Sequence, residues 1–133
     1  MRRRSESTHP PKGAEPEVFL PLPHLPFHIL LALSPAPRHG WGVVQRIAEL
    51  TGGRDEPSSG SLYLAMSRLV ERGLIEEAPR PEGETSTRRR YFRLTGLGHR
   101  VLTAETERLA GLVEISRRLG AGDAGSGAGA EGR

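Results

Sequence analysis

An amphipathic segment followed at once by two short apolar runs is the feature that most limits how this chain can fold. Apolar side chains recur at helical spacing between Ser58 and Gly73. The runs 74–78 and 88–94 come next and bracket a polar loop rich in proline, glycine, glutamate and threonine, a pattern typical of a β-hairpin with a long tip. A helix that leads straight into such a hairpin indicates winged helix-turn-helix architecture.

Two shorter helices are predicted before this unit. Residues 27–33 are apolar at nearly every position, and Pro26 at their start favours a helix over a buried strand. Residues 40–50 carry apolar side chains at positions i, i+1, i+4 and i+7, which is the pattern of an amphipathic helix that ends at the following Thr-Gly-Gly run. The third helix is expected to begin after Ser58, whose hydroxyl can accept from a backbone N–H of the first turn.

A long helix is predicted after the hairpin, from its cap Thr95 to about residue 119. Its later part carries more apolar surface than a single terminal helix can bury on a small core, so a helix–helix dimer is expected. The acidic Glu105 interrupts the seven-residue spacing of the apolar stripe. A helix folded back on its own domain is the alternative. The dimerisation residues predicted on this helix are Leu102, Leu109, Leu112, Val113 and Leu119.

The composition of the two ends bounds the folded part. Six of the 11 prolines fall within residues 1–26, and six of the 17 glycines fall within residues 120–133. Such segments cannot bury enough apolar surface to offset their chain entropy. We therefore expect a mostly α fold with a small β-hairpin wing, a winged helix-turn-helix plus a long C-terminal dimerisation helix. The predicted parts are a flexible N-terminal tail over 1–23, the winged helix-turn-helix domain over 24–94, the dimerisation helix over 95–119 and a disordered Gly/Ala tail over 120–133.

Several classes of function are disfavoured by what the sequence lacks. With no cysteine, the chain can form neither a disulfide nor a thiolate zinc site, which fits a cytoplasmic protein. No stretch approaches the roughly 20 apolar residues of a membrane span, so no membrane partner is expected. No serine lies in a Gly-x-Ser-x-Gly motif and no glycine-rich phosphate loop with lysine occurs, so we expect no enzyme and no cofactor.

The histidines and the glutamates of the hairpin are not expected to form a site. Of the five histidines, the pair His24 and His28 has the i, i+4 spacing of a helical metal site. This pair lacks an obvious third ligand, and His24 precedes the predicted helix, so no metal is expected. The glutamates of the hairpin, Glu77 and Glu84 among them, are expected to be ordinary solvated carboxylates.

The third helix carries the strongest functional signal. Its apolar stripe leaves small hydroxyl residues, Tyr63 and Leu64 on the other face. A first turn of serines and glycine can approach DNA closely, and its free N–H groups favour a phosphate. Tyr63 can donate a hydrogen bond to a phosphate or lie against a sugar. The alternative is an ordinary solvated face with Tyr63 half-buried as packing.

An arginine run precedes the second strand of the hairpin. Arg88, Arg89 and Arg90 come directly before Tyr91 and Phe92, and all but one of the 19 basic residues of the chain are arginine. Arginine suits the forked recognition of phosphates and base edges. Side chains alternate along a strand, so Arg89 and Tyr91 are predicted on one face, with Phe92 on the core side. The run is expected to bind phosphates or enter the minor groove, and a solubilising charged face is the alternative.

Three residues at the start of the second helix are also singled out. His39 is expected to cap that helix or pack there, and Trp41 is expected to be a core or interface anchor. Arg38 is a candidate phosphate contact. The formal net charge is only +3, so contacts to nucleic acid would rely on local basic patches rather than on a global field.

In this order and spacing, the segments resemble the PadR-like family of transcriptional regulators. The similarity covers about residues 27–119. It is carried by ILLAL at 29–33, HGWG at 39–42, LTGGR at 50–54, SSGSLY at 58–63, LVERGLI at 69–75 and RRYFRLT at 89–95. The family usually has tyrosine where Trp41 stands, and proline is common where Ser59 stands. A single helix after the hairpin is similar to the short branch of the family.

The resemblance implies a homodimeric winged-helix repressor. Its third helix would enter the major groove of double-stranded DNA, its wing would grip the backbone, and its C-terminal helix would dimerise with help from Leu30 of the first helix. Because the last helix has no aromatic residue, the flat-drug site of some short relatives is not expected. The DNA-binding residues predicted in this way are Arg38, His39, Ser59, Gly60, Ser61, Tyr63, Leu64, Ser67, Arg68, Arg88, Arg89 and Arg90.

The predicted function is sequence-specific transcriptional regulation at a pseudo-palindromic operator, bound by two third helices about 34 Å apart. Release by a small-molecule effector that enters the dimer cleft is compatible with this function. A winged-helix module that binds another protein through the long helix is the alternative. Salt-sensitive binding to DNA distinguishes the two.

Overall fold

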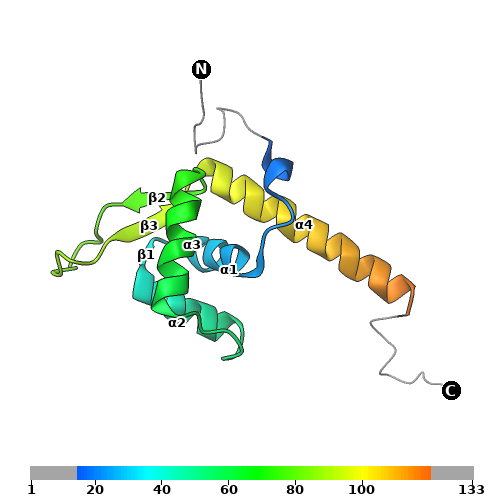
Figure 1. Cartoon of the computed structure of the whole chain (residues 1–133), viewed down its shortest axis with the longest axis horizontal. Coiled ribbons are helices and arrows are strands. Elements are labelled where there is room, and N and C mark those ends of the chain that lie inside the picture. The colour runs from blue at the N-terminus through cyan, green and yellow to red at the C-terminus, as the bar shows by residue number, and fades with distance from the viewer. Residues whose placement is uncertain (1–14, 121–133) are drawn as a thin grey trace.

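The chain packs three short helices, a small sheet and one long helix around a common core (Figure 1). The computed structural model describes residues 15–120. This architecture confirms the predicted fold class, a mostly helical winged helix-turn-helix with a long last helix. Within the described range, no helix is both long and apolar enough to cross a bilayer. The elements are the 3-10 helix η1 (Pro16–Phe19), α1 (His24–Leu33), β1 (Arg38–His39), α2 (Gly40–Leu50), α3 (Ser59–Glu71), β2 (Ile75–Ala78), β3 (Tyr91–Leu94) and α4 (Gly96–Arg118).

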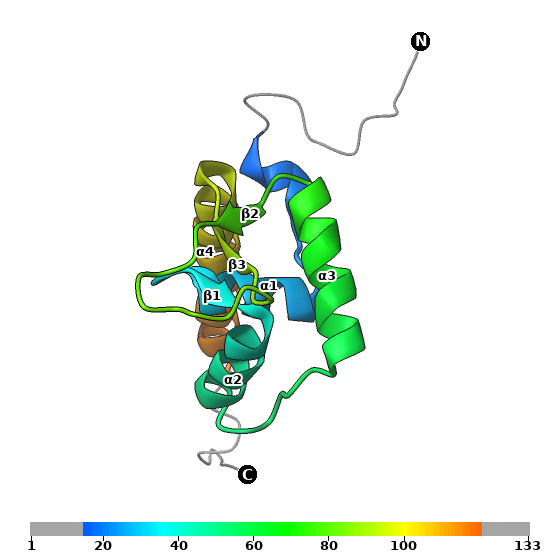
Figure 2. The same cartoon turned by 90° about the vertical axis from the view of Figure 1, so that its left-hand side faces the viewer.

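Helix α1 is the centre of the packing, between α3 on one side and α4 on the other (Figure 2). This position explains why residues 27–33 are apolar at nearly every position: neighbours cover most of the helix. The predicted stripes of α2 and α3 face inward, and the bounds of α2 are the predicted ones. The apolar core side chains with least exposure are Ile29, Leu30, Ala32, Val43, Ile47, Leu62, Leu74, Ile75 and Val101.

Side chains cap the three helices that follow α1, and each cap was expected from the sequence. The ring Nδ1 of His39 accepts from the N–H of Gly42 at 3.1 Å. The Ser58 hydroxyl accepts from the N–H of Ser61 at 3.2 Å. Thr95 does the same at the start of α4. These oxygens and the ring nitrogen satisfy N–H groups that a helix start leaves without partners.

The sheet has three antiparallel strands in the order β1-β3-β2, one more than the predicted hairpin. Strand β1 is two residues long, too short to show a pattern in sequence, and it pairs Arg38 with Phe92. The sequence predicted that the arginines 88–90 belong to the second strand of the hairpin. Strand β3 begins only at Tyr91, so these arginines lie in the loop and that prediction is wrong. The predicted alternation is also wrong at its first step, because Tyr91 and Phe92 are both buried. Tyr91 is covered because its ring packs edge-on against His39, with centroids 5.2 Å apart, and its hydroxyl donates to Glu84.

The segment before α1 is packed, which corrects part of the predicted flexible tail. Phe19 and Leu22 belong to the core, and the guanidinium of Arg72 lies 4.8 Å from the centroid of the Phe19 ring. Helix α1 begins at His24, three residues before the predicted start, with Pro26 in its first turn. The rest of that predicted tail, residues 1–14, and nearly all of the predicted Gly/Ala tail, residues 121–133, lie outside the described residues.

Glu105 explains why the apolar stripe of α4 is interrupted. This residue is 1% exposed, and its carboxylate accepts from the backbone N–H of Leu22 at 2.9 Å. The guanidinium of Arg108, one turn later, donates to both of its oxygens. The hydrogen bonds from Arg108, and then that from Leu22, hold the pKa of Glu105 below its usual value although burial opposes this. The first half of α4 is therefore fixed to its own domain.

Two of the residues predicted for dimerisation lie in this same core. Leu30 is fully buried and Leu102 is 9% exposed, so neither offers a face to a second chain. Their apolar character is explained by packing within one chain. The last turns of α4 differ, because they project away from the domain (Figure 1). The large apolar side chains exposed there are Leu112, Val113, Ile115 and Leu119.

We expect Gly98→Ala to destabilise the fold and Gly111→Ala, on the same helix, to stabilise it. A Cβ at Gly98 would collide with the carbonyl oxygen of Leu74, whereas a Cβ at Gly111 would meet nothing. The first change should cost about 1–3 kcal/mol or more because the backbone must move. The second should add about 0.5–1 kcal/mol, as glycine is a poor helix former. Urea denaturation of both variants measures this, and equal stabilities would contradict it.

Candidate nucleic-acid interface

The outer face of α3 presents the residues predicted to read DNA. Leu62, Met66 and Leu69 hold the opposite face in the core. Tyr63 is 56% exposed, so its ring is half-buried, as the alternative expected, and the rest of the ring is open to a ligand. Ser58 caps the helix, and the N–H groups of the first turn lie at its exposed tip. The predicted residues exposed on this face are Ser59, Gly60, Ser61, Tyr63, Leu64, Ser67 and Arg68.

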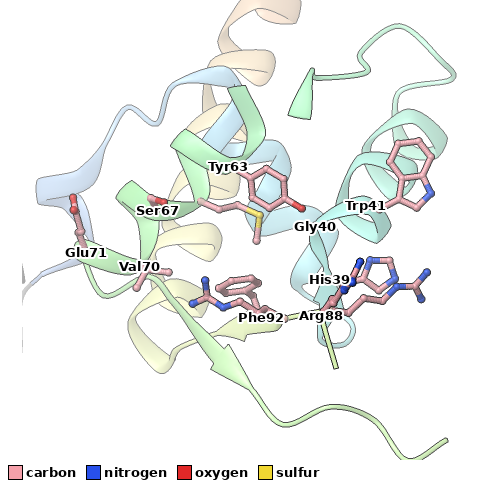
Figure 3. Close-up of a pocket in the computed structure, with 12 residues that line it drawn as sticks. His39, Gly40, Trp41, Tyr63, Ser67, Val70, Glu71, Arg88 and Phe92 are labelled. Atoms are coloured by element: carbon pink, nitrogen blue, oxygen red, sulfur yellow. The ribbon is translucent and has the colours of Figure 1, made fainter. Parts of the chain in front are cut away.

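A groove joins this helix to the loop of the wing (Figure 3). It has a volume of about 450 Å³. Tyr63, Ser67 and Glu71 line it from α3, and the arginine run lines it from the wing. Trp41 at the start of α2 lines it as well. The predicted reading helix and the predicted phosphate-binding arginines therefore share one concave surface.

The position of Tyr63 depends on the glycine at the start of α2. A Cβ on Gly40 would lie 2.8 Å from the Tyr63 hydroxyl oxygen, so the ring lies directly over this residue. Trp41 is 55% exposed beside it, so the core half of the prediction, a core or interface anchor, is wrong. An exposed indole and an exposed phenol at one groove can stack on sugars or bases and donate hydrogen bonds.

The arginines of the wing are partly neutralised by glutamates. Arg89 pairs with Glu84 at 3.3 Å and Arg90 pairs with Glu77 at 3.2 Å. Arg88 has no carboxylate partner within the described part of the chain. The sequence analysis missed these pairs because it treated the glutamates of the hairpin as solvated. Opposite charges on the two arms of a hairpin were the available signal.

Glu84 holds the loop of the wing together and is not an ordinary carboxylate. A hydrogen bond from Tyr91, then one from the backbone of Ser86 and a weaker contribution from Arg89, lower its pKa to about 2. The same hydrogen bond raises the pKa of Tyr91. Glu84 therefore stays ionised at neutral pH, where it keeps Arg89 beside the groove.

His39 and Arg38 have structural partners at the edge of this surface. Burial, followed by the nearby charge of Arg89, lowers the pKa of His39, so its ring is neutral at pH 7 and its Nδ1 remains an acceptor for the α2 cap. The Nε of Arg38 donates to the carbonyl oxygen of Ala32 at 2.8 Å. That bond uses one of five guanidinium donors, so the others remain available to a phosphate.

Comparison with known proteins identifies the family. Residues 29–104, more than half of the chain, match the model of the Transcriptional regulator PadR-like family. The chain belongs to this family. It is therefore a transcriptional regulator, as the resemblance implied. A comparison with curated proteins gives no match.

Solved structures with the same fold agree with this PadR-like assignment. A PadR family transcription regulator from Clostridium difficile R20291 has a TM-score of 0.62 and 21% identity, over 73% of this chain and 98% of that one. A transcriptional regulator from Clostridium thermocellum has a TM-score of 0.60 and 23% identity, over 71% and 87%. Bacillus subtilis PadR in complex with operator DNA has a TM-score of 0.52 and 21% identity, over 60% and 45%.

We expect the Glu84 carboxyl to titrate near pH 2 and Tyr91→Phe to move its midpoint up towards the ordinary value of 4.5. The variant removes the largest of the hydrogen bonds that favour the charged form. Carbon-detected NMR of the side-chain carboxyl measures the midpoint. Tyr63→Phe is the matched control, because Tyr63 lies on the groove without a bond to Glu84. An unshifted midpoint in Tyr91→Phe would show that contacts other than the Tyr91 hydrogen bond keep the Glu84 carboxyl ionised.

Proposed function

We propose that this PadR-like protein is a sequence-specific DNA-binding repressor that acts as a homodimer on a pseudo-palindromic operator. The observation that carries the proposal is the groove in which the exposed face of α3 and the arginines of the wing meet. Bacillus subtilis PadR, a protein of similar fold, has been solved with operator DNA. That complex supports the same class of ligand here.

The proposed docking places α3 in the major groove with its capped tip towards the bases. The small side chains Ser59, Gly60 and Ser61 let the backbone approach closely, and Leu64 and Ser67 are placed to contact base edges. Tyr63 contacts a phosphate or a sugar. The phosphate contacts that we assign are Arg38, His39, Arg68, Arg88, Arg89 and Arg90.

The glutamates of the wing shape how this binding would proceed. Arg89 and Arg90 must exchange a carboxylate for a phosphate, whereas Arg88 has no such partner to leave within the described residues. The pair of Arg90 and Glu77 is exposed on both sides, and such pairs are worth little in water, so this exchange is inexpensive. The side chain of Glu84 is only 13% exposed, so Arg89 leaves a more sheltered partner. Arg88 is the contact with the least competition.

Dimerisation is assigned to the exposed end of α4. Leu109, Leu112, Val113 and Leu119 were predicted for it, and Ile115 adds to the same apolar end. Two copies paired in this way would present two α3 helices to successive major grooves, about 34 Å apart. A small molecule that changed the pairing would alter that spacing and release the operator.

Selection of bound fragments from random DNA, with the purified chain at physiological salt, tests the proposal. A symmetric enriched motif with two half-sites is the expected result. Enrichment of no motif would overturn sequence-specific binding. An asymmetric motif would overturn the homodimer on a pseudo-palindrome. Nanomolar capture of a protein by the end of α4, with no salt-sensitive DNA binding, would favour the protein-docking alternative.

We expect Arg88→Ala to weaken binding to all DNA sequences alike and to reduce the slope of log K against log salt by about one. A lost phosphate contact releases one counterion fewer, which is the reason for the change in slope. Arg100→Ala, on the exposed face of α4, removes the same charge away from the groove and is the control. An unchanged slope in Arg88→Ala would remove this residue from the phosphate contacts.

We expect Leu112→Glu to convert the dimer to a monomer and to weaken operator binding by roughly 100-fold. A buried charge without a partner opposes the pairing of two apolar helix ends. Thr103→Glu adds the same charge at an exposed site in the first half of α4 and should leave the dimer intact. Sedimentation velocity measures the mass, and a dimeric Leu112→Glu variant would place the interface elsewhere.

A further inference from the structure

A cluster of two histidines and an aspartate lies on the side of the domain where α1 begins. His24 and His28 are one turn apart on α1, and Asp55 lies in the loop between α2 and α3. One donor atom of each residue lies within 4.8 Å of the others. The sequence analysis expected no metal because the histidine pair lacked a third ligand and His24 preceded the predicted helix. Here His24 is helical and Asp55 is the third donor.

The distances in this cluster suit a small divalent ion. Nε2 of His24 and Oδ2 of Asp55 are 3.0 Å apart, and Nδ1 of His28 lies 3.9 Å from the same oxygen. Donors about 2.0–2.1 Å from a tetrahedral ion are roughly 3.3 Å from one another. The two separations from the Asp55 oxygen lie within about 0.6 Å of that value, and the two histidine nitrogens lie within 4.8 Å of each other, so side-chain rotations that bring the histidines closer together would close the site. Two imidazoles and a carboxylate form a donor set that binds zinc and similar first-row ions.

The buried nitrogen of His28 points to a ligand more directly. Its Nδ1 is shielded from solvent and has no hydrogen-bond partner within the described structure. The side chain is 14% exposed, and the oxygen of Asp55 is too distant to accept a hydrogen bond from it. An unpartnered buried polar atom costs about 1–3 kcal/mol. A metal ion bound between Nδ1 and the carboxylate would supply the missing partner.

The surroundings of the cluster have room for an ion and hold its ligands in place. A cavity of about 260 Å³ is lined by the three residues and by Glu56 and Ser61. The backbone N–H of Asp55 donates to the hydroxyl of Thr51 at 3.0 Å, which fixes the loop at this point.

We propose that His24, His28 and Asp55 bind one divalent transition-metal ion of the zinc type, with water or Glu56 in the remaining position. The ion joins the first turn of α1 to the loop before α3. Ser58, the cap of α3, follows Asp55 by three residues, so a bound ion restrains the start of that helix. The proposal does not depend on the proposed function, because it concerns binding within a single chain.

The test uses the full chain without a histidine tag, freed of metal by a chelator. Calorimetry with Zn²⁺ and the visible absorption of added Co²⁺ measure stoichiometry and affinity. One ion per chain is expected, with tetrahedral-type Co²⁺ absorption. His24→Gln and Asp55→Asn should each weaken binding at least tenfold. Changes in residues that only support metal ligands already cost about that much, and these two residues are themselves proposed ligands. His99→Gln, an exposed histidine of α4, is the matched control and should change nothing.

Thermal unfolding gives a second measurement that is independent of any DNA. Zn²⁺ should raise the Tm of the natural chain and of His99→Gln, because a ligand of the folded state stabilises it. The rise should be absent in His24→Gln, whose side chain is 70% exposed and contributes little packing. No binding of either ion, or equal binding by His24→Gln and Asp55→Asn, would overturn the proposal and leave the cluster as a hydrogen-bonded contact between α1 and the loop.

Discussion

The contacts at the corner where α3 leads into the wing fix the positions of α3, the wing and α4 relative to one another. The hydroxyl of Thr95 donates to the carbonyl oxygen of Gly73 at 2.6 Å, and its backbone N–H donates to that of Leu74 at 3.1 Å. The bare Cα of Gly98 lets α4 pass against Leu74. One set of backbone contacts thus joins the end of α3, the start of β2 and the start of α4. The shape of the groove follows from this corner, because neither α3 nor the wing can tilt without disturbing it.

The charge of the groove is distributed less simply than its arginines suggest. Glu84 is held ionised by Tyr91 and places Arg89, while Glu77 on the neighbouring strand pairs with Arg90. These glutamates reduce the local positive charge. They also restrain long arginine side chains that would otherwise lose rotamer freedom when they bind. A wing of this kind gives up some electrostatic attraction in return for a defined shape.

Local features were predicted well from the sequence, and contacts between distant residues were not. The bounds of α2 and the caps at Ser58 and Thr95 follow from spacing and side-chain chemistry within one or two turns. The bond between Leu22 and Glu105 joins residues 83 positions apart, and no local pattern shows it. The cluster of His24, His28 and Asp55 was missed for the same reason, because Asp55 lies in the loop between α2 and α3 and not on α1. The ion pairs of the wing are an intermediate case. The pairing of residues across a hairpin can be estimated from the sequence, but the positions of the side chains in its loop cannot.

Helix α4 is held at one end and projects at the other (Figure 1). Its 23 residues span about 35 Å at the usual rise, and Glu105 ties the near half to the domain. In a pair joined through the far ends, the helix acts as a lever: a turn of three degrees at the pivot moves the near end by roughly 2 Å. Selection for operator geometry can therefore act on small side-chain changes near Leu112 and Leu119, far from the surface that touches DNA.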